Sequence, residues 1–399
     1  MAVNQVTFVL PGLNRLGGAE REAILLAKGL ARRGWRVSMV ALSGDGGEAA
    51  QDLTAAGVTF LTLRMRKGVA DPRGWIRFHR WLREQAPEVL HAHLPHATWI
   101  VRGSRLAAPV RVVVDTLHTS FAGPATRRLG YRMTGWLPDR VTAVSRGVAE
   151  AYVAAGLVRP ERVTILPNGI DVDAWAPDAA ERARLRAELG LTNEFLWCAA
   201  GRLEPVKDYP SLLRAFAGLP SPSQLVIAGS GTQEAELRTL AAEMALGDRV
   251  RFLGFQADVR HWMRAADGFV LSSLWEGLPM SLLEASACGL SSVATSVSGT
   301  REVLVEAETG FLAEPGSAES LRRAMNRLMQ MRPENRESMG MNARQRIVEQ
   351  FGLDAVLDRL EDLYRDLLEK NPHPRRYPAR AQSSALSGAP ATAGPTVRN

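Results

Sequence analysis

Short, continuous apolar runs alternate with amphipathic segments along most of the chain. Within each run the apolar residues are largely continuous rather than alternating with polar ones, which is typical of parallel strands covered on both faces by helices. The segments between the runs have the length that a helical crossover needs. We therefore predict strands at 6–10, 36–42, 58–63, 88–93, 110–118, 140–145, 162–167, 194–201, 224–229, 249–254, 268–273, 291–295 and 310–313.

This alternation predicts an α/β fold with two Rossmann-like, doubly wound parallel-sheet domains that face each other across a cleft. Asn, Gly, Asp and Pro cluster at 168–178, so we expect domains at 1–168 and 169–350 with the joint between them. An amphipathic helix is predicted at 352–370. The remaining residues, 371–399, are rich in Pro, Ala, Ser and Gly without periodicity, which predicts disorder.

Composition favours a globular protein of the cytoplasm. Of the 399 residues 46% are hydrophobic and 23% charged, and no stretch of about 18 residues is apolar throughout. The first residues lack the basic start of a signal peptide. Cys198 and Cys288 lie far apart in apolar runs, so we interpret them as core residues in a reducing compartment.

The net charge of +7 is unevenly distributed, with +11 in residues 1–168 and −4 in the remainder. A basic first half suggests an anionic partner such as a membrane surface, a lipid phosphate or nucleic acid. Residues 72–84 interleave Trp75, Phe78 and Trp81 with arginines, which suits a helix on the inner membrane face. The same pattern also suits a crossover helix packed on the sheet. No nucleic-acid-binding module accompanies the charge, so nucleic acid is not expected.

Two segments carry features of an anion site. Gly17 and Gly18 open a helix after the first strand, where backbone N–H groups can approach an anion, although a purely structural turn fits equally well. The G-x-G-x-x-G spacing of nicotinamide dehydrogenases is absent. Arg202 and Lys207 follow the strand at 194–201, at the carboxyl edge where open α/β sheets bind ligands. Two cations there suit a diphosphate, and two solvated surface cations are the alternative.

The segment 272–289 carries the most specific pattern. Glu276 lies in a loop after a strand, and the alternative is an exposed loop acid. Glu284 lies in an apolar helical run where an unpaired carboxylate is costly, so a ribose diol or a structural salt bridge should satisfy it. Between them a helix begins, and its free N–H groups would face an anion over Leu278, Pro279, Met280 and Ser281.

Histidines end two strands of the first half, in HAHLPH (91–96) and at His118. The H-x-H spacing has no third ligand nearby, so we predict no metal site. His118 should face the anion site, where it can accept or shuttle a proton, and a packed histidine is the alternative. The acidic pair in DVD (171–173) lies in the predicted joint, so we interpret it as turn chemistry.

Together these residues resemble the retaining glycosyltransferases of GT-B fold, a family 4-like group that includes group 1 enzymes of bacterial lipid and polysaccharide assembly. The resemblance covers about residues 5–370. It is carried in order by LGGAER (16–21), TLHTS (116–120), VTAVS (141–145), ILPNGID (165–171), GRLEPVKD (201–208) and EGLPMSLLE (276–284), the family's E-x7-E element. The loop SVSGTREV (296–303) departs from the family, because Gly-Thr-Arg, with Arg301, stands where relatives often have a Gly-Gly pair.

The resemblance implies transfer of a hexosyl unit from a UDP-, GDP- or ADP-sugar to an acceptor hydroxyl with retention, without metal or other cofactor. It implies a lipid-linked or glycan acceptor in lipid-linked glycan, lipopolysaccharide or capsular and exopolysaccharide synthesis. By the same resemblance, the helix at 352–370 crosses back to the first domain. It also implies that Gly18 approaches the donor diphosphate, that Arg202 and Lys207 neutralise it, that Glu276 touches the sugar and Glu284 the ribose, and that His118 lies beside the sugar and acceptor.

Two other functions suit the same fold. A sugar-nucleotide epimerase would form no glycoside, and the basic, aromatic surface of the first half favours a transferase over it. A non-catalytic sugar-nucleotide-binding protein would not need His118 or Glu276 together with both cations.

Overall fold

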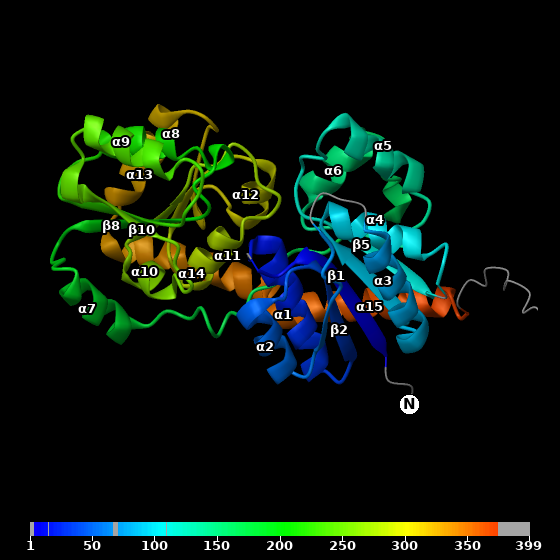
Figure 1. Ribbon diagram of the computed structural model, residues 1–399. Helices are drawn as coiled ribbons and strands as arrows, with labels where there is room; N and C mark the ends of the chain where they lie inside the picture. Colours follow the sequence, from blue (N-terminus) through cyan, green and yellow to red (C-terminus); the bar gives the residue numbers. More distant parts are fainter. Residues whose placement is uncertain (1–3, 15, 67–70, 109, 374–399) are drawn as a thin grey trace, which may run out of the picture.

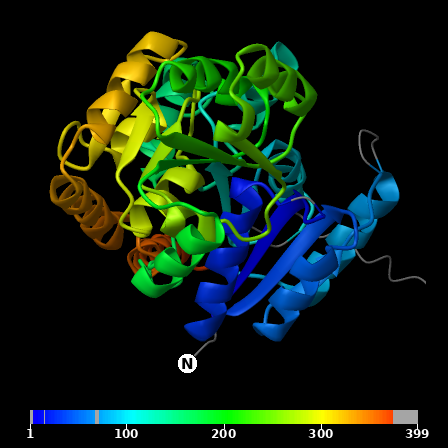
Figure 2. The same ribbon diagram turned by 90° about the vertical axis from the view of Figure 1, so that its left-hand side faces the viewer.

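The structure, a computed structural model, describes residues 4–14, 16–66, 71–108 and 110–373. The predicted disordered tail lies almost entirely outside these residues. The chain forms two α/β units, each built on a parallel sheet with helices on both faces (Figures 1 and 2). The predicted fold class is therefore confirmed.

The first unit contains a seven-stranded sheet in the order β3-β2-β1-β4-β5-β6-β7. Each pairing is parallel, as in β1 against β4, where Val6 lies opposite Val89. The strands are β1 (Gln5–Gly12), β2 (Arg36–Ser43), β3 (Thr59–Thr62), β4 (Val89–His93), β5 (Val112–Leu117), β6 (Arg140–Ala143) and β7 (Val163–Ile165).

The second unit contains a six-stranded sheet in the order β10-β9-β8-β11-β12-β13. The strands are β8 (Phe195–Ala200), β9 (Ser223–Ala228), β10 (Val250–Gly254), β11 (Gly268–Leu271), β12 (Ser292–Thr295) and β13 (Gly310–Ala313). All thirteen lie where the sequence predicts them, with ends that differ by a few residues, which is within the ordinary uncertainty of strand limits.

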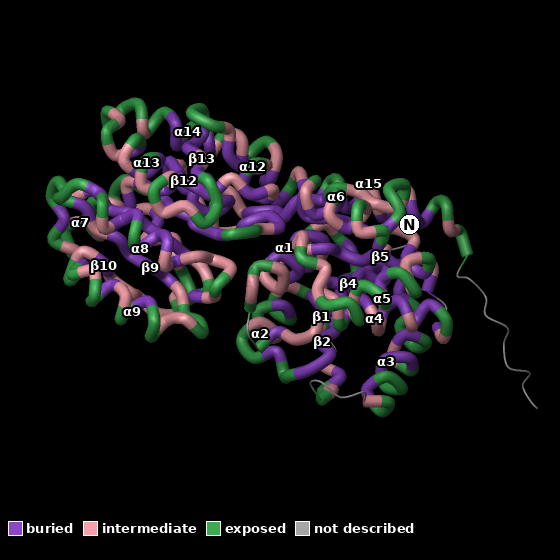
Figure 3. The backbone as a smooth tube through the Cα atoms, turned by 90° about the horizontal axis from the view of Figure 1, so that it is seen from above, coloured by how far each residue is buried: buried purple, intermediate pink, exposed green. Residues whose placement is uncertain are grey.

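The central strands are mostly apolar because helices cover both faces of each sheet, whereas the edge strands β3, β7 and β10 are only partly buried. All six residues of β5 and all six of β8 are buried, and the tube coloured by burial is buried along the sheets and exposed on the outer helices (Figure 3). The covering helices of the first unit are α1 (Gly18–Arg32), α2 (Gly47–Ala55), α3 (Pro72–Gln85), α4 (Pro95–Ser104), α5 (Ala125–Thr134) and α6 (Arg146–Ala154).

The second unit carries the remaining helices. They are α7 (Ala179–Glu188), α8 (Tyr209–Ala217), α9 (Glu234–Glu243), α10 (Arg260–Ala265), α11 (Met280–Ala287), α12 (Ser298–Val303), α13 (Ala318–Met329) and α14 (Pro333–Phe351). The last helix, α15 (Leu353–Lys370), leaves this unit and packs against α1 of the first (Figure 1). Gly29 makes room for it, since a Cβ there would lie 2.5 Å from Leu357.

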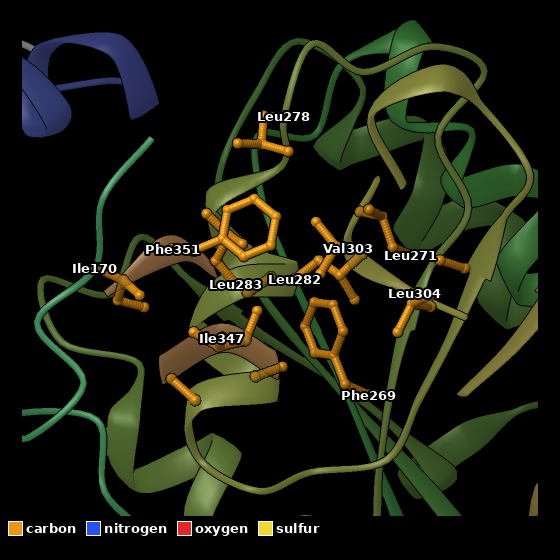
Figure 4. Close-up of a cluster of buried hydrophobic side chains, with 14 of the residues drawn as sticks. Ile170, Phe269, Leu271, Leu278, Leu282, Leu283, Val303, Leu304, Ile347 and Phe351 are labelled. Carbon is orange, nitrogen blue, oxygen red and sulfur yellow. The ribbon is translucent and has the colours of Figure 1, made fainter. Parts of the chain in front are cut away.

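The two units share one apolar cluster. Ile170 of the connecting segment donates its N–H to the carbonyl of Phe351 at 2.9 Å and accepts from the N–H of Leu353. Its side chain lies with Phe351, Ile347 and the buried leucines of α11 (Figure 4). The chain crosses between the units twice at this place, so the core itself joins them.

Helix α3 carries the Trp/Arg pattern singled out in the sequence. Its residues Phe78 and Leu82 are fully buried against the rest of the unit, and Trp81 stacks on Phe78. Only Trp75 and Ile76 expose substantial apolar surface. This arrangement favours the crossover-helix interpretation. No helix in the described part of the chain is long and apolar enough to cross a bilayer.

Candidate active site

Both sheets have a topological switch point, and most of the predicted site residues follow the strands at these two places. His118 follows the neighbouring strand β5. In the first sheet β1 and β4 are neighbours, and in the second β8 and β11 are neighbours. The chain leaves β1 toward α1 in one direction and β4 toward α4 in the other, which opens a crevice at the carboxyl ends. The glycine turn follows β1, the predicted cations follow β8, and Glu276 follows β11.

The glycine turn meets the second unit directly. Gly17 is the N-cap of α1, and its N–H donates to the Glu20 carboxylate at 3.1 Å. A Cβ on Gly18 would lie 3.3 Å from Cγ of Met280, the first residue of α11. The amino ends of α1 and α11 therefore lie against each other across the interface, and both point backbone N–H groups toward it.

Lys207 and Glu276 form an ion pair, with Nζ 2.5 Å from Oε1. Ser273 also donates to this oxygen at 2.6 Å. Both charged side chains are largely buried, so Glu276 is not the exposed loop acid that the sequence left open, and Lys207 is not a solvated surface cation. The pair links the loop after β8 to the loop after β11 across the switch point.

Arg202 remains exposed and makes no side-chain hydrogen bond to any described residue. Burial raises the pKa of Glu20 in the first turn of α1, and the charge of Arg202 opposes that rise. Arg202 therefore lies close enough to act on the first unit. One cation is thus held by a carboxylate, and the other is available to an anion in the crevice.

The start of α11 offers unpaired donors. Pro279 is its N-cap, and its carbonyl accepts from the N–H groups of Leu282 and Leu283. Within the described chain, the N–H groups of Leu278, Met280 and Ser281 have no acceptor. Free amides at a helix start favour an anion.

Glu284 lies one turn into α11 and is 7% exposed, and its carboxylate accepts no hydrogen bond from any described residue. Burial raises its pKa to about 7, the charge of Arg21 on α1 opposes this, and Asp258 adds to it. The structural salt bridge considered from the sequence is not formed. The sequence did not point to Arg21 as a site residue, although it ends the LGGAER motif, because its proximity to Glu284 depends on how the two units pack together.

The strand-end histidines form a packed group. His93 Nδ1 lies 3.0 Å from His118 Nε2, while His91 contacts the hydroxyls of Tyr364 and Thr116, each at 2.6 Å. Burial lowers the pKa of His118 to about 4 and that of His91 to about 3. His118 is therefore neutral at pH 7, which suits a hydrogen-bonding group better than a cation. Among the described residues no group of acidic, His and Cys side chains could hold a metal ion.

Close packing at Gly277 places the loop of His118 next to the loop that carries Glu276. A Cβ on Gly277 would overlap the carbonyl oxygen of His118, so these loops of the two units touch. Gly299 supports Gly277 from the other side, where a Cβ would overlap the Gly277 carbonyl. The structure thus gathers Gly18, Lys207, Glu276, Met280 and His118 at one interface.

Two other segments noted in the sequence are structural in the geometry observed. Arg301 donates to the carbonyl of Ser296, and Thr300 bonds backbone carbonyls at the start of α12. Asp171 accepts from the N–H of Ala174 and closes a turn, as predicted for DVD.

Comparison with known proteins identifies the family. The family model "Glycosyltransferase Family 4" matches residues 16–174, and "Glycosyl transferases group 1" matches residues 181–346. A D-inositol 3-phosphate glycosyltransferase of Thermomonospora curvata is 30% identical over 312 residues, which cover 73% of this chain and 68% of the relative. The chain is a GT-B glycosyltransferase of the family 4-like group.

Other relatives agree with this glycosyltransferase assignment. The UDP-Gal:alpha-D-GlcNAc-diphosphoundecaprenol alpha-1,3-galactosyltransferase of Escherichia coli is 28% identical over 75% of this chain and 81% of its own length. Among solved structures, Anabaena HepE in complex with UDP and glucose matches with a TM-score of 0.81 at 21% identity, over 91% of this chain and all of that one. This structural likeness supports the fold.

In this glycosyltransferase a buried carboxyl group lies beneath the glycine turn. Glu22 of α1 accepts the N–H of Gly169 at 2.9 Å through Oε1, and its Oε2 has no partner in the described chain. Burial raises the pKa of Glu22 to about 8. The Glu22 carboxyl group is therefore mostly protonated in the folded protein at neutral pH.

Glu22 should make the enzyme less stable as pH rises. Between about pH 4.5 and 8 the folded form keeps this proton and the unfolded form has lost it, so the folding free energy weakens by up to about 1.4 kcal/mol per pH unit. Glu22→Gln mimics the protonated acid and does not titrate. We expect its melting temperature to exceed that of wild type by a margin that widens from pH 5 to pH 8.

The buried histidines destabilise both proteins as pH falls below about 6.5, because the unfolded chain then binds protons that the folded one does not. The difference in melting temperature between Glu22→Gln and wild type cancels this effect and is therefore the quantity to measure. Glu308→Gln, an exposed acid, is the matched control and should give a margin that stays flat. A constant margin for Glu22→Gln would show that Glu22 is ionised in the folded enzyme.

Proposed function

We propose that this enzyme moves a hexosyl unit from a nucleoside-diphosphate sugar to an acceptor hydroxyl with retention of anomeric configuration. The proposal rests on one observation, the meeting of the Lys207–Glu276 pair, the amino end of α11 and His118 where two switch points face each other. Arg202, Lys207 and the free amides of Met280 and Ser281 would bind the diphosphate. Glu276 and His118 would contact the sugar, and Glu284 the ribose.

The chemistry follows from where charge develops. As the bond from the anomeric carbon to the diphosphate breaks, negative charge grows on the leaving oxygen and positive charge on the sugar. Cations and fixed amides aimed at the diphosphate stabilise the transition state more than the ground state. Protein cations would supply this neutralisation, so we expect turnover to be unaffected by EDTA. Neutral His118 would hydrogen-bond a hydroxyl of the sugar or acceptor.

The relatives suggest which substrates to try first. The name of the E. coli relative specifies UDP-galactose and a diphosphoundecaprenol-linked acceptor, and HepE was solved with UDP-glucose. We propose a UDP-sugar, with GDP- and ADP-sugars as the other donors, and a lipid-linked or glycan acceptor. This would place the enzyme in lipid-linked glycan, lipopolysaccharide or exopolysaccharide synthesis on the inner face of the cytoplasmic membrane.

A donor screen tests the proposal. We expect one UDP-, GDP- or ADP-sugar to raise the melting temperature specifically, since a ligand stabilises the native state by its occupancy. With that donor and a lipid-linked acceptor, NMR of the product should show the donor's anomeric configuration. An inverted product would disprove retention, an epimerised sugar nucleotide without glycoside would identify an epimerase, and binding without either product would identify a binding protein.

Glu284 should make donor binding depend on pH. In the free enzyme its carboxyl group keeps a proton up to about pH 7 because it is buried. Ribose hydroxyls donate best to the carboxylate, so the affinity for the sugar nucleotide should rise as pH increases through 7. Glu284→Gln should bind independently of pH, about 10- to 100-fold more weakly than wild type at pH 8, the range expected for a hydrogen bond to a charged group.

Calorimetric titration from pH 6 to 8.5 measures this dependence. An intact sugar nucleotide is the ligand, because its phosphodiester groups do not titrate in this range. Glu308→Gln serves again as the exposed control and should follow wild type. If Glu284→Gln retained the wild-type pH profile, the ribose role would have to be abandoned.

A further inference from the structure

Helix α5, the loop before it and the turn after it expose four large apolar side chains. Phe121, Leu129, Met133 and Trp136 are 60%, 57%, 67% and 56% exposed. We call these four the α5 face. Leu129, Met133 and Trp136 recur at i, i+4 and i+7, and Gly135 at the end of α5 keeps helical backbone angles, so the three form one stripe along the helix and the turn that follows it. Isolated exposed apolar residues are ordinary, but a contiguous stripe marks an interaction surface.

The opposite side of α5 is firmly packed, so the exposure is not a loosely attached helix. Tyr131 is buried between Trp99 and Tyr152. A Cβ on Gly130 would lie 2.9 Å from the Trp99 ring, so this glycine lets the helix approach α4 closely. The Trp136 indole N–H donates to the Met133 carbonyl at 3.0 Å, which satisfies its polar atom. The stripe is held outward by a packed inner face.

Basic residues border this stripe. Arg128 and Arg132 each precede one of its apolar residues, and both are exposed. Arg162 lies behind Trp136, donating to its carbonyl at 3.0 Å. The sequence has no Asp or Glu from 119 to 138. Asp139, the next carboxylate, forms an ion pair with Arg105 and is largely buried. The segment 119–138 that carries the α5 face therefore contributes apolar and cationic side chains and no carboxylate.

We propose that the α5 face binds the surface of an anionic bilayer, with Leu129, Met133 and Trp136 in the interface and the arginines at the lipid phosphates. An apolar stripe beside a basic one is the pattern of interfacial helices. A second copy of the chain fits less well, because a symmetric contact would bring the arginines of both copies together. An anionic membrane instead attracts them.

Helix α5 lies close to the candidate active site, so a membrane bound there would be near His118. The loop 118–124 runs directly from His118 to the first turn of α5, next to α6 at the border with the second unit (Figure 1). Phe121 lies 6.3 Å from Trp275 of the second unit, measured between ring centroids. A bilayer at the α5 face would bring a lipid-borne acceptor beside His118. This last step rests on the proposed function, whereas membrane binding itself does not.

Vesicle co-sedimentation of the full chain tests the proposal. We expect binding to phosphatidylglycerol–phosphatidylcholine vesicles at low salt, weaker binding at high salt, and little binding to phosphatidylcholine alone. The variant Leu129→Ser/Met133→Ser/Trp136→Ser should lower the partition coefficient at least tenfold. Arg128→Glu/Arg132→Glu should remove the preference for anionic lipid. The matched control is Trp75→Ser/Ile76→Ser, which removes the exposed apolar pair of α3 and should bind like wild type.

Each variant is also checked by circular dichroism and by its thermal response to the donor. An α5 variant that keeps both and no longer binds vesicles supports the proposal. A wild-type enzyme that responds to the donor but does not bind anionic vesicles overturns it and leaves the proposed function standing. Loss of binding in the α3 control but not in the α5 variant would also overturn it. So would a wild-type dimer that the α5 substitutions convert to a monomer, since the face would then be a protein interface.

Discussion

Lys207→Ala is expected to lower turnover by about two to three orders of magnitude, the effect of losing one group that stabilises transition-state charge. The loss has two parts. The variant removes a cation from the leaving diphosphate, and among the described residues it also leaves the buried Glu276 carboxylate with Ser273 alone as a hydrogen-bond donor. Steady-state kinetics with the donor found in the screen measures the effect, which should appear mainly in kcat.

The matched control is Lys28→Ala. Lys28 also pairs with a carboxylate, Asp52, at 2.8 Å, but on the outer side of α1, so its loss should leave turnover within about twofold of wild type. A double variant with Glu276→Gln separates the two parts. If the effects of Lys207→Ala and Glu276→Gln simply added, the ion pair would not act as a unit. If Lys207→Ala kept most of the turnover, the cation would have no role at the diphosphate.

Gly277→Ala is expected to lower kcat/KM by about 100-fold, although it adds only a methyl group. The backbone of Gly277 is not in the left-handed region, so alanine costs no conformational strain there. The new Cβ would instead overlap the His118 carbonyl, and Gly299 prevents the loop from retreating. The two units would have to separate by roughly 1 Å, and a misplacement of this size costs about 100-fold in rate.

Gly103→Ala is the control for Gly277→Ala. Gly103 lies in α4, and a Cβ there would make only ordinary contact with Trp75, at 3.9 Å. This variant should be as active as wild type and slightly more stable, because alanine favours a helix. Donor binding distinguishes the causes of a loss in Gly277→Ala. Donor affinity kept within a few-fold with slow turnover would indicate misaligned units, whereas unchanged turnover would show that the His118 contact is not needed.

Local patterns were sufficient to predict the strands and the edge at which the site lies. Parallel strands that each feed a crossover helix end at the same edge of their sheet. Gly17 and Gly18 could therefore be assigned to the carboxyl edge of the first sheet, and Arg202 and Glu276 to that of the second, from strand positions alone. For the same reason the histidines at the ends of two strands of the first sheet were expected at one edge. His93 ends β4, His118 follows β5, and the two side chains are in contact.

Pairings across the chain could not be predicted this way. Lys207 meets Glu276 because β8 and β11 are neighbours, and strand order is not written in the hydrophobic pattern of either strand. Arg21 acts on Glu284 only because α1 and α11 meet end to end. The protonation of Glu22 and the neutrality of His118 follow from burial, which depends on the elements that cover each residue.

Exposure decided between the two candidate membrane helices. Composition singled out 72–84 because tryptophans alternate with arginines there, yet packing buries Phe78 and Leu82. Helix α5 has a less distinctive sequence, and its apolar stripe is recognisable only because nothing in the described chain covers it.

By itself the sequence determined the two α/β units, the sheet edges and the types of residue at each edge, because all of these follow from short-range periodicity and a fixed crossover hand. Only the tertiary structure decided which charges pair, which carboxyls are protonated and which apolar surface faces out. Those properties depend on distances and solvent exclusion between segments up to hundreds of residues apart, and these exist only once the two units are packed together.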